Sequence, residues 1–313
     1  MLNELSAAGV LVHRTEWRWG CRWGWPDSAM MVRHRKRFAD ADLLVFGKLL
    51  HETVQGRLSS LGKRMILITP YRPAEMWSGW RPDNKVLNSF ESIVVQAKIF
   101  EEDLRKFGYQ GRVATLPYLP PEVEKASRWP ETSVLQVGFL GRLVPDKNLS
   151  YLIHSFSHLR KMGIDAQLHF FGDGPERESL KSLVGEMRLD SIEFHGYQDR
   201  KKIPAAIGQC HLFAFSSRTE GQCLAALEIM AHGRPVLGTP VGAFPEFLCG
   251  PLGCVAPLGD PIAFATALKA LADRVLRGDI TPADVQRAYE NRFSRSRVID
   301  EYMRIFDAPA QQT

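Results

Sequence analysis

Apolar residues after residue 130 alternate between compact runs and helical stripes. The compact runs have the length and composition of strands buried in a parallel sheet. They lie at residues 134–140, 167–171, 192–195, 212–215, 236–237 and 254–255. The segments between them predict helices at 148–162, from Pro175 onward, and near 200–208, 222–232 and 260–274. This alternation predicts an α/β domain with a doubly wound parallel sheet.

The first part of the chain carries fewer such signals. Compact apolar runs at residues 10–12, 43–46, 65–69 and 92–96 predict further strands, and a helix after the last run should end at Gly108. A linker is predicted at residues 117–131, which hold four prolines. We therefore expect an N-terminal domain over residues 1–125 and a C-terminal domain over residues 131–290.

Composition narrows the class of protein. The chain has 313 residues, of which 45% are hydrophobic and 24% charged, and this excludes a wholly disordered protein. No apolar run approaches the roughly 18–20 residues of a membrane span, and no signal segment opens the chain, so we expect a cytoplasmic protein. The five cysteines never form a CxxC pair, which argues against a disulfide framework or a zinc site.

Positive charge is concentrated in the first part of the chain. Residues 1–130 hold 20 Lys+Arg and 14 Asp+Glu, whereas the rest holds 20 and 21. The dense run Arg33–Arg37 fits either an anionic partner or a solvated helix face. No nucleic-acid motif accompanies it. Six tryptophans, which could stack on a sugar, meet a lipid interface or pack in the core, also lie here: Trp17, Trp19, Trp23, Trp25, Trp77 and Trp80.

Candidate chemistry lies in the loops after the C-terminal strands. Ligands of such sheets bind at the carboxyl ends of the strands, so the loops at 141–147, 172–175, 196–199 and 216–222 should face one crevice. Arg142 and Lys147 flank a predicted helix start and could bind a diphosphate, although such a pair is also common surface charge. Gly172-Asp173-Gly174 lacks a third glycine, so a tight turn is favoured over a dinucleotide fingerprint.

Two glutamates stand eight residues apart in the most informative stretch, residues 216–228. Glu220 and Gly221 precede a predicted helix that contains Glu228. Eight helical residues span about 12 Å, which approaches the separation of hexose and ribose in a sugar nucleotide. Carboxylates accept hydrogen bonds from vicinal hydroxyls, and Gly221 would let a ligand approach the backbone. An N-terminal helix acid and an ion-paired glutamate are the alternative interpretation.

Taken in order, these segments resemble glycosyltransferase family 4, the retaining nucleotide-sugar enzymes of GT-B fold. The resemblance runs from about residue 134 to 308. Five segments match motifs of the family: the stretch from Val137 through Arg142 to Lys147, the turn from Phe171 to Arg177, the loop Phe194–Tyr197, the E-x7-E motif Glu220–Glu228, and the turn Val241–Glu246. The implied fold is two Rossmann-like doubly wound domains facing a crevice. The implied terminal helix, at 291–308, crosses back to the N-terminal domain.

The resemblance also implies roles for matching residues. Arg142 and Lys147 would hold the donor diphosphate and stabilise its leaving charge, Glu220 would hold the hexose, Glu228 the ribose, and Tyr197 would border the base. Glu220, Arg142 and Lys147 are thus the candidate catalytic residues. The full set of candidate donor-binding residues is Gly141, Arg142, Lys147, Gly172, Tyr197, Glu220, Gly221, Gln222, Cys223, Leu224 and Glu228.

The N-terminal domain departs from the family pattern. The family's first strand and glycine-rich loop are not found, so we expect either an abbreviated domain or a true start that lies upstream. The family's histidine of this domain has no equivalent after residues 65–69, where Pro70-Tyr71-Arg72 stands, and His13 is a poor substitute. Acceptor-binding residues are therefore not assigned.

The sequence predicts a retaining hexosyltransferase that uses a nucleoside diphosphate sugar and an acceptor hydroxyl. No cofactor or metal is expected, since Arg142 and Lys147 supply positive charge. The acceptor could be anionic or membrane-associated, and the protein itself could lie peripherally at the inner membrane surface. Two alternatives stay open: a non-catalytic nucleotide-sugar-binding protein or scaffold, and another GT-B-shaped enzyme such as a sugar-nucleotide epimerase or a phosphorylase.

Overall fold

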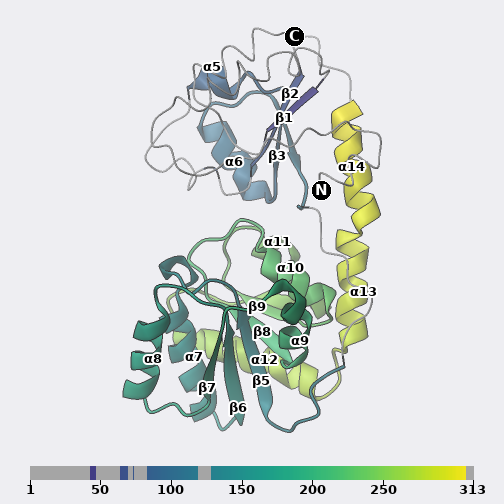
Figure 1. Cartoon of the computed structure of the whole chain (residues 1–313). Coiled ribbons are helices and arrows are strands. Elements are labelled where there is room, and N and C mark those ends of the chain that lie inside the picture. The colour runs from purple at the N-terminus through teal and green to yellow at the C-terminus, as the bar shows by residue number, and fades with distance from the viewer. Residues whose placement is uncertain (1–42, 47–63, 70–72, 74–82, 119–127, 308–313) are drawn as a thin grey trace. The chain divides into compact units, whose positions relative to one another are not determined.

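The computed structural model of the chain describes residues 43–46, 64–69, 73, 83–118 and 128–307 (Figure 1). Contacts divide the chain into two units. Unit 1 comprises Met1–Leu119 and Ser296–Thr313, and unit 2 comprises Pro120–Arg295. Several features of the sequence analysis lie outside the described residues. They are the strand predicted at residues 10–12, His13, the Arg33–Arg37 run, Pro70-Tyr71-Arg72 and the six tryptophans.

Unit 2 contains a six-stranded parallel sheet in the order β10-β9-β8-β5-β6-β7. The chain enters the sheet at β5, builds outward to β7, then crosses to β8 and builds outward the other way. This is the doubly wound topology that the sequence predicts. The strands are β5 Leu135–Leu140, β6 Ala166–Phe171, β7 Ile192–Gly196, β8 Leu212–Phe215, β9 Val236–Gly238 and β10 Gly253–Val255.

Helices of unit 2 connect these strands (Figure 1). In α7 the apolar stripe predicted from the sequence is fully buried, and α7 contacts both α8 and α12, whereas α10 contacts α13. The helices are α7 Leu149–Lys161, α8 Arg177–Glu186, α9 Ile203–Gly208, α10 Leu224–Ala231, α11 Phe244–Phe247, α12 Pro261–Leu276 and α13 Pro282–Phe293. Three short 3-10 helices are η1 Pro145–Lys147, η2 Arg200–Lys202 and η3 Gly250–Leu252.

The helices differ from the prediction near Pro175 and near Thr281. Pro175 precedes α8 by two residues instead of opening it, because Pro175 and Glu176 form a turn. The sequence analysis also missed α13, whose start is fixed by a capping box in which Thr281 and Asp284 exchange hydrogen bonds. Pro282 follows the cap in the first turn, where its fixed φ suits a helix.

Unit 1 contains a parallel sheet of four described strands in the order β1-β2-β3-β4. The strands are β1 Leu43–Phe46, β2 Arg64–Ile68, β3 Ser92–Val95 and β4 Arg112–Thr115, and the described helices beside them are α5 Asn84–Leu87 and α6 Lys98–Lys106. The first three strands and the end of α6 at Gly108, where φ is 90°, match the prediction. The sequence analysis missed β4, which is only partly buried and has no apolar run.

The last helix of the chain, α14 Arg295–Asp307, packs against the sheet of unit 1. Its buried residues Val298, Tyr302, Ile305 and Phe306 join a core cluster with Ile66, Ile68, Val94 and Leu116. The Tyr302 hydroxyl donates to the carbonyl of Pro117 at 3.1 Å, and Arg64 donates to the carbonyl of Phe306 at 2.7 Å. Residues from opposite ends of the chain therefore share one core.

Among the described residues, no helix combines the length and the apolar character that crossing a membrane requires.

Candidate active site

The loops that follow β5 and β6 touch through their backbones. A Cβ added to Gly172, which has a φ of 145°, would lie 1.8 Å from the carbonyl oxygen of Gly141. A Cβ on Gly174 would lie 2.3 Å from the carbonyl oxygen of Leu143. The amide of Leu143 donates to the carbonyl of Asp173 at 2.9 Å. The two glycines therefore allow the two loops to pack closely. The sequence analysis, which favoured a tight turn here, did not anticipate this second role.

The loop after β7 also contacts the loop after β6. The amide of Gly172 donates to the carbonyl of Gly196 at 2.9 Å, and Gly196 has a φ of 72°. The next residue, Tyr197, is 76% exposed. The structure thus places Tyr197 at the carboxyl end of its strand, with a ring surface open to a ligand.

Lys147 and Glu220 form an ion pair between the loops after β5 and β8. Lys147 ends η1, and its Nζ lies 2.6 Å from Oε1 of Glu220. The same carboxylate oxygen accepts a hydrogen bond from the Ser217 hydroxyl at 2.7 Å. The Glu220 side chain is only 6% exposed and that of Lys147 21%. Residues that are 73 positions apart in sequence thus meet in a largely buried, charge-assisted contact.

Further hydrogen bonds hold these two loops together. The Ser216 hydroxyl donates to the carbonyl of Lys147 at 2.9 Å, and the amide of Arg218 donates to the carbonyl of Asp146 at 2.8 Å. The Thr239 hydroxyl donates to the carbonyl of Ser217 at 2.6 Å. The sequence analysis assigned no role to Ser216 or Ser217, although their position directly after a buried strand marks them as loop hydroxyls near the site.

The segment between Glu220 and α10 is not helical, which corrects the sequence analysis. Because α10 begins at Leu224, the estimate of about 12 Å of helix between Glu220 and Glu228 does not apply. Cys223 takes a left-handed conformation, with a φ of 56°. A Cβ on Gly242 would lie 2.2 Å from the carbonyl oxygen of Glu220, so the turn after β9 presses directly on this segment.

The start of α10 offers backbone donors beside Glu220. The first N–H groups of an α-helix have no partner within the helix, and the dipole makes that end positive. Leu224, the first helical residue, is 56% exposed, whereas Gln222 is buried. Gly221 accepts a hydrogen bond from the amide of Ala243 at 3.0 Å. This end of α10 can therefore receive an anionic or hydroxyl-bearing ligand at Leu224.

Glu228 and Arg142 differ from the Lys147–Glu220 pair in how deeply they are buried and in the residues they interact with. Glu228 is on α10 and half-buried, and its burial raises the pKa of the carboxyl while the charge of Arg200 lowers it. Arg142 is exposed on the loop after β5. The two predicted diphosphate-binding residues thus differ in their surroundings, because the ammonium of Lys147 lies on a buried carboxylate.

Comparison with known proteins identifies the family of this unit. Residues 135–274 match the family model described as glycosyl transferases group 1. Unit 2 carries a group 1 glycosyltransferase domain. This finding confirms the resemblance drawn from the sequence motifs, since the match begins at β5 and ends within α12.

Curated relatives match the same domain. The chain is 30% identical over 137 residues to alpha-D-kanosaminyltransferase of Streptomyces kanamyceticus, covering 43% of this chain and 36% of the relative. It is 32% identical over 176 residues to phosphatidyl-myo-inositol mannosyltransferase of Mycobacterium leprae, covering 55% and 46%. The matched segments thus span less than half the length of these two relatives.

Solved structures extend the likeness to the fold of both units. HepE of Anabaena, crystallised in complex with UDP, aligns with a TM-score of 0.75 at 14% identity, over 90% of this chain and 82% of that chain. At such low identity the match shows the fold alone. The glycosyltransferase domain and unit 1 are the two Rossmann-like α/β units of a GT-B protein, as the sequence predicts.

Proposed function

We propose that the protein is a retaining glycosyltransferase that moves a hexosyl unit from a nucleoside diphosphate sugar to an acceptor hydroxyl. The observation that carries this proposal is the buried Lys147–Glu220 contact at the carboxyl ends of β5 and β8, within a group 1 glycosyltransferase domain. Both curated relatives are named for the transfer of a sugar unit, and the HepE structure holds UDP. Retention of configuration rests on the resemblance to glycosyltransferase family 4.

The charged residues would act chiefly on the diphosphate. Arg142 is exposed and can bind phosphate oxygens through its planar fork. The diphosphate would draw the Lys147 ammonium away from Glu220, since its charge competes for the same cation. The Glu220 carboxylate would then accept hydrogen bonds from hexose hydroxyls. Donor binding therefore exchanges an internal ion pair for two contacts with the ligand.

Other residues would position the rest of the donor. The N–H groups at Leu224 and its neighbours would contact the diphosphate or hexose at the positive end of α10. Glu228 would accept from ribose hydroxyls, and the exposed ring of Tyr197 would border the base. Positioning and stabilisation of the charge that develops on the leaving diphosphate would supply most of the rate enhancement. The positive charge of residues 1–130 supports an anionic acceptor.

Nucleotide binding is the first test. The full chain would be melted alone and with UDP, GDP, dTDP, ADP and their common sugar conjugates. A ligand at 100 times its Kd stabilises by about 2.7 kcal/mol, which corresponds to a shift of several degrees. A response to one nucleotide supports the donor site. A cooperatively melting protein that responds to none of them contradicts it.

Transfer is the second test, with Arg142→Ala/Lys147→Ala as the variant and Lys181→Ala as its control. Lys181 is an exposed lysine of α8 whose partner is Glu178, on the same helix. Loss of diphosphate contacts should lower the transfer rate by far more than tenfold, whereas the control should retain it. Transfer by the double variant within about tenfold of wild type, or about 1.4 kcal/mol of barrier, refutes the assigned roles.

A third measurement separates transfer from its alternatives. Donor binding without transfer to any acceptor would favour a non-catalytic nucleotide-sugar-binding protein. Conversion of the donor sugar without an acceptor would favour an epimerase. The anomeric configuration of the product, measured by NMR, tests retention directly.

A further inference from the structure

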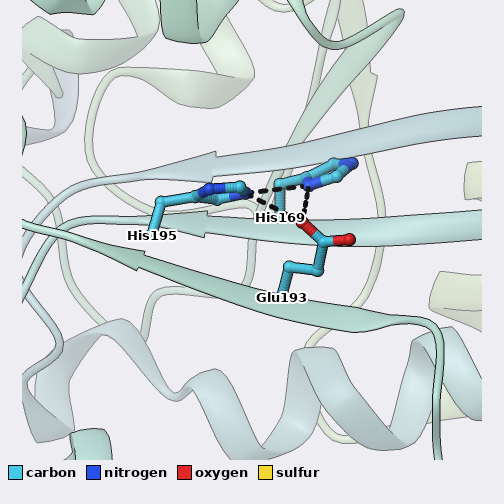
Figure 2. A group of neighbouring side chains, drawn as sticks. All are labelled: His169, Glu193 and His195. Atoms are coloured by element: carbon cyan, nitrogen blue, oxygen red, sulfur yellow. Dashed lines mark hydrogen bonds and ion pairs between the residues drawn. The ribbon is translucent and has the colours of Figure 1, made fainter.

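A second polar cluster lies within the strands of the glycosyltransferase domain, away from the loops already described. His169 is on β6, and Glu193 and His195 are on β7, the last strand of the sheet (Figure 2). His169 pairs with Glu193 in register, and the register shifts between Phe170 and Phe171. Side chains two residues apart on a strand share a face, so all three groups meet on one side of the sheet.

Three atoms of this cluster form a compact triangle. Nδ1 of His169 lies 3.0 Å from Nε2 of His195 and 3.7 Å from Oε2 of Glu193, and those last two atoms are 3.6 Å apart. The point in their plane that is equidistant from the three atoms lies about 2.0 Å from each. That is the bond length that Zn²⁺ forms with imidazole nitrogen and carboxylate oxygen.

The tautomer of His169 suits metal binding. Gln136, on β5, donates from its amide nitrogen to the carbonyl of Val134 at 3.1 Å, which turns its Oε1 toward His169. Because Oε1 can only accept, the contact of 2.6 Å requires the proton on Nε2 of His169. The lone pair then lies on Nδ1, the His169 atom of the triangle. Histidine ligands of metals commonly donate their other N–H to an oxygen in this way.

Packing holds the two imidazoles in place, and one side of the cluster is open. The ring of His195 stacks on Phe171 with centroids 4.6 Å apart, and His169 stacks on the same residue at 6.0 Å. The His169 side chain is 7% exposed, whereas those of His195 and Glu193 are 27% and 53% exposed. An ion could therefore enter from solvent and keep water as a fourth ligand.

We propose that His169, Glu193 and His195 bind a Zn²⁺ ion that ties β7 to β6. Two imidazoles and one carboxylate with an open fourth position form a ligand set typical of zinc. The ion would replace the direct His169–His195 hydrogen bond and draw the Glu193 carboxylate onto the metal. The site is separate from the Lys147–Glu220 contact, so it does not depend on the proposed transferase activity.

Zinc titration of the full chain, freed of metal by a chelator, tests the proposal. A chromophoric zinc indicator competes for the ion, and wild type is compared with Glu193→Gln and His195→Ala. His154→Ala, which removes an exposed histidine of α7, is the matched control. Wild type and the control should each bind one more zinc ion per chain than either cluster variant. Gln136→Leu should lower the affinity for that zinc ion by about 10–100-fold.

Two further readouts decide between zinc binding and a plain hydrogen-bonded cluster. Co²⁺ added to wild type should give the visible absorption of a tetrahedral nitrogen and oxygen site, and Glu193→Gln should lack it. Glu193→Gln keeps the size of an exposed side chain, so it should fold even if His195→Ala does not. Equal zinc stoichiometry and affinity in wild type and a folded Glu193→Gln would overturn the proposal.

Discussion

The loop cluster around Lys147 and Glu220 and the strand cluster around His169 occupy the same sheet but satisfy their polar groups differently. The loop cluster combines a cation, a carboxylate and a hydroxyl, which complement one another within 2.7 Å. The strand cluster combines two imidazoles and a carboxylate, three groups that can all offer lone pairs. A ligand must therefore displace an internal contact at the loops, whereas a cation would complete the strand cluster.

The difference follows from where the residues lie. In a parallel sheet the strand backbones hydrogen-bond to one another, so a buried polar side chain within a strand depends on neighbouring side chains. Loop residues can also use free backbone groups, as Ser216 and Thr239 do here. Substitutions in the two clusters should therefore differ in their cost to stability.

Gly172→Ala should have the largest effect, because Gly172 follows β6 and joins the loop after β5 to the loop after β7. Its φ of 145° is unsuited to alanine, and the added Cβ would meet a backbone oxygen. We expect a loss of more than about 3 kcal/mol in the free energy of unfolding, measured in denaturant. Gly185→Ala, where nothing lies within 4 Å of the added Cβ, is the control and should be neutral or stabilising.

Lys147→Met should be next, since it leaves the Glu220 carboxylate buried without its cation. Removing one partner of a buried ion pair costs about 3 kcal/mol. The double variant Lys147→Met/Glu220→Gln should recover most of this loss, because no uncompensated charge then stays buried. Lys181→Met, at an exposed pair, should change stability by less than about 1 kcal/mol. Equal stability of Lys147→Met and wild type would show that the loop contact is not formed in solution.

Gln136→Leu should have a smaller effect in protein freed of metal. It leaves the Nε2–H of His169 without an acceptor, which costs about 1–3 kcal/mol for a buried donor. Glu193→Gln, at an exposed partner of the same cluster, should change stability by less than about 0.5 kcal/mol. Denaturant melts of the two variants would show whether Gln136 or Glu193 supports the metal-free strand cluster, and a larger loss with Glu193→Gln would contradict the assigned roles.

Glu228→Gln should have the smallest effect and one that depends on pH. Burial raises the pKa of Glu228 above its ordinary value of 4.5, so ionisation opposes folding at neutral pH. The cost is complete above the raised pKa and disappears as pH falls below 4.5, where the carboxyl is protonated in both the folded and the unfolded state. The variant should therefore be more stable than wild type at pH 7 and lose this advantage in acid, whereas Glu186→Gln, exposed on α8, should stay near wild type at both pH values.

Much of the fold could be predicted from sequence because buried strands and amphipathic helices leave local patterns. The apolar runs of β2, β3, β8 and β9 are contiguous, and the stripe of α7 repeats at helical spacing. By contrast, β4 has the sequence Arg-Val-Ala-Thr and lies at the end of the described sheet, partly exposed, so its pattern is weak. The start of α13 depends on a cap between Thr281 and Asp284, which the search for apolar runs overlooked.

The candidate site divides in the same way. Local patterns were enough to show which loops follow the strands and which charged residues they carry, because loop position and residue type are local properties. The folded chain was needed to show that Lys147 lies on Glu220, 73 residues away, and that His169 meets Glu193 and His195 across two strands. Strand register and the close approach of loops at glycines set these contacts, and both depend on backbone pairing between segments that are distant in sequence.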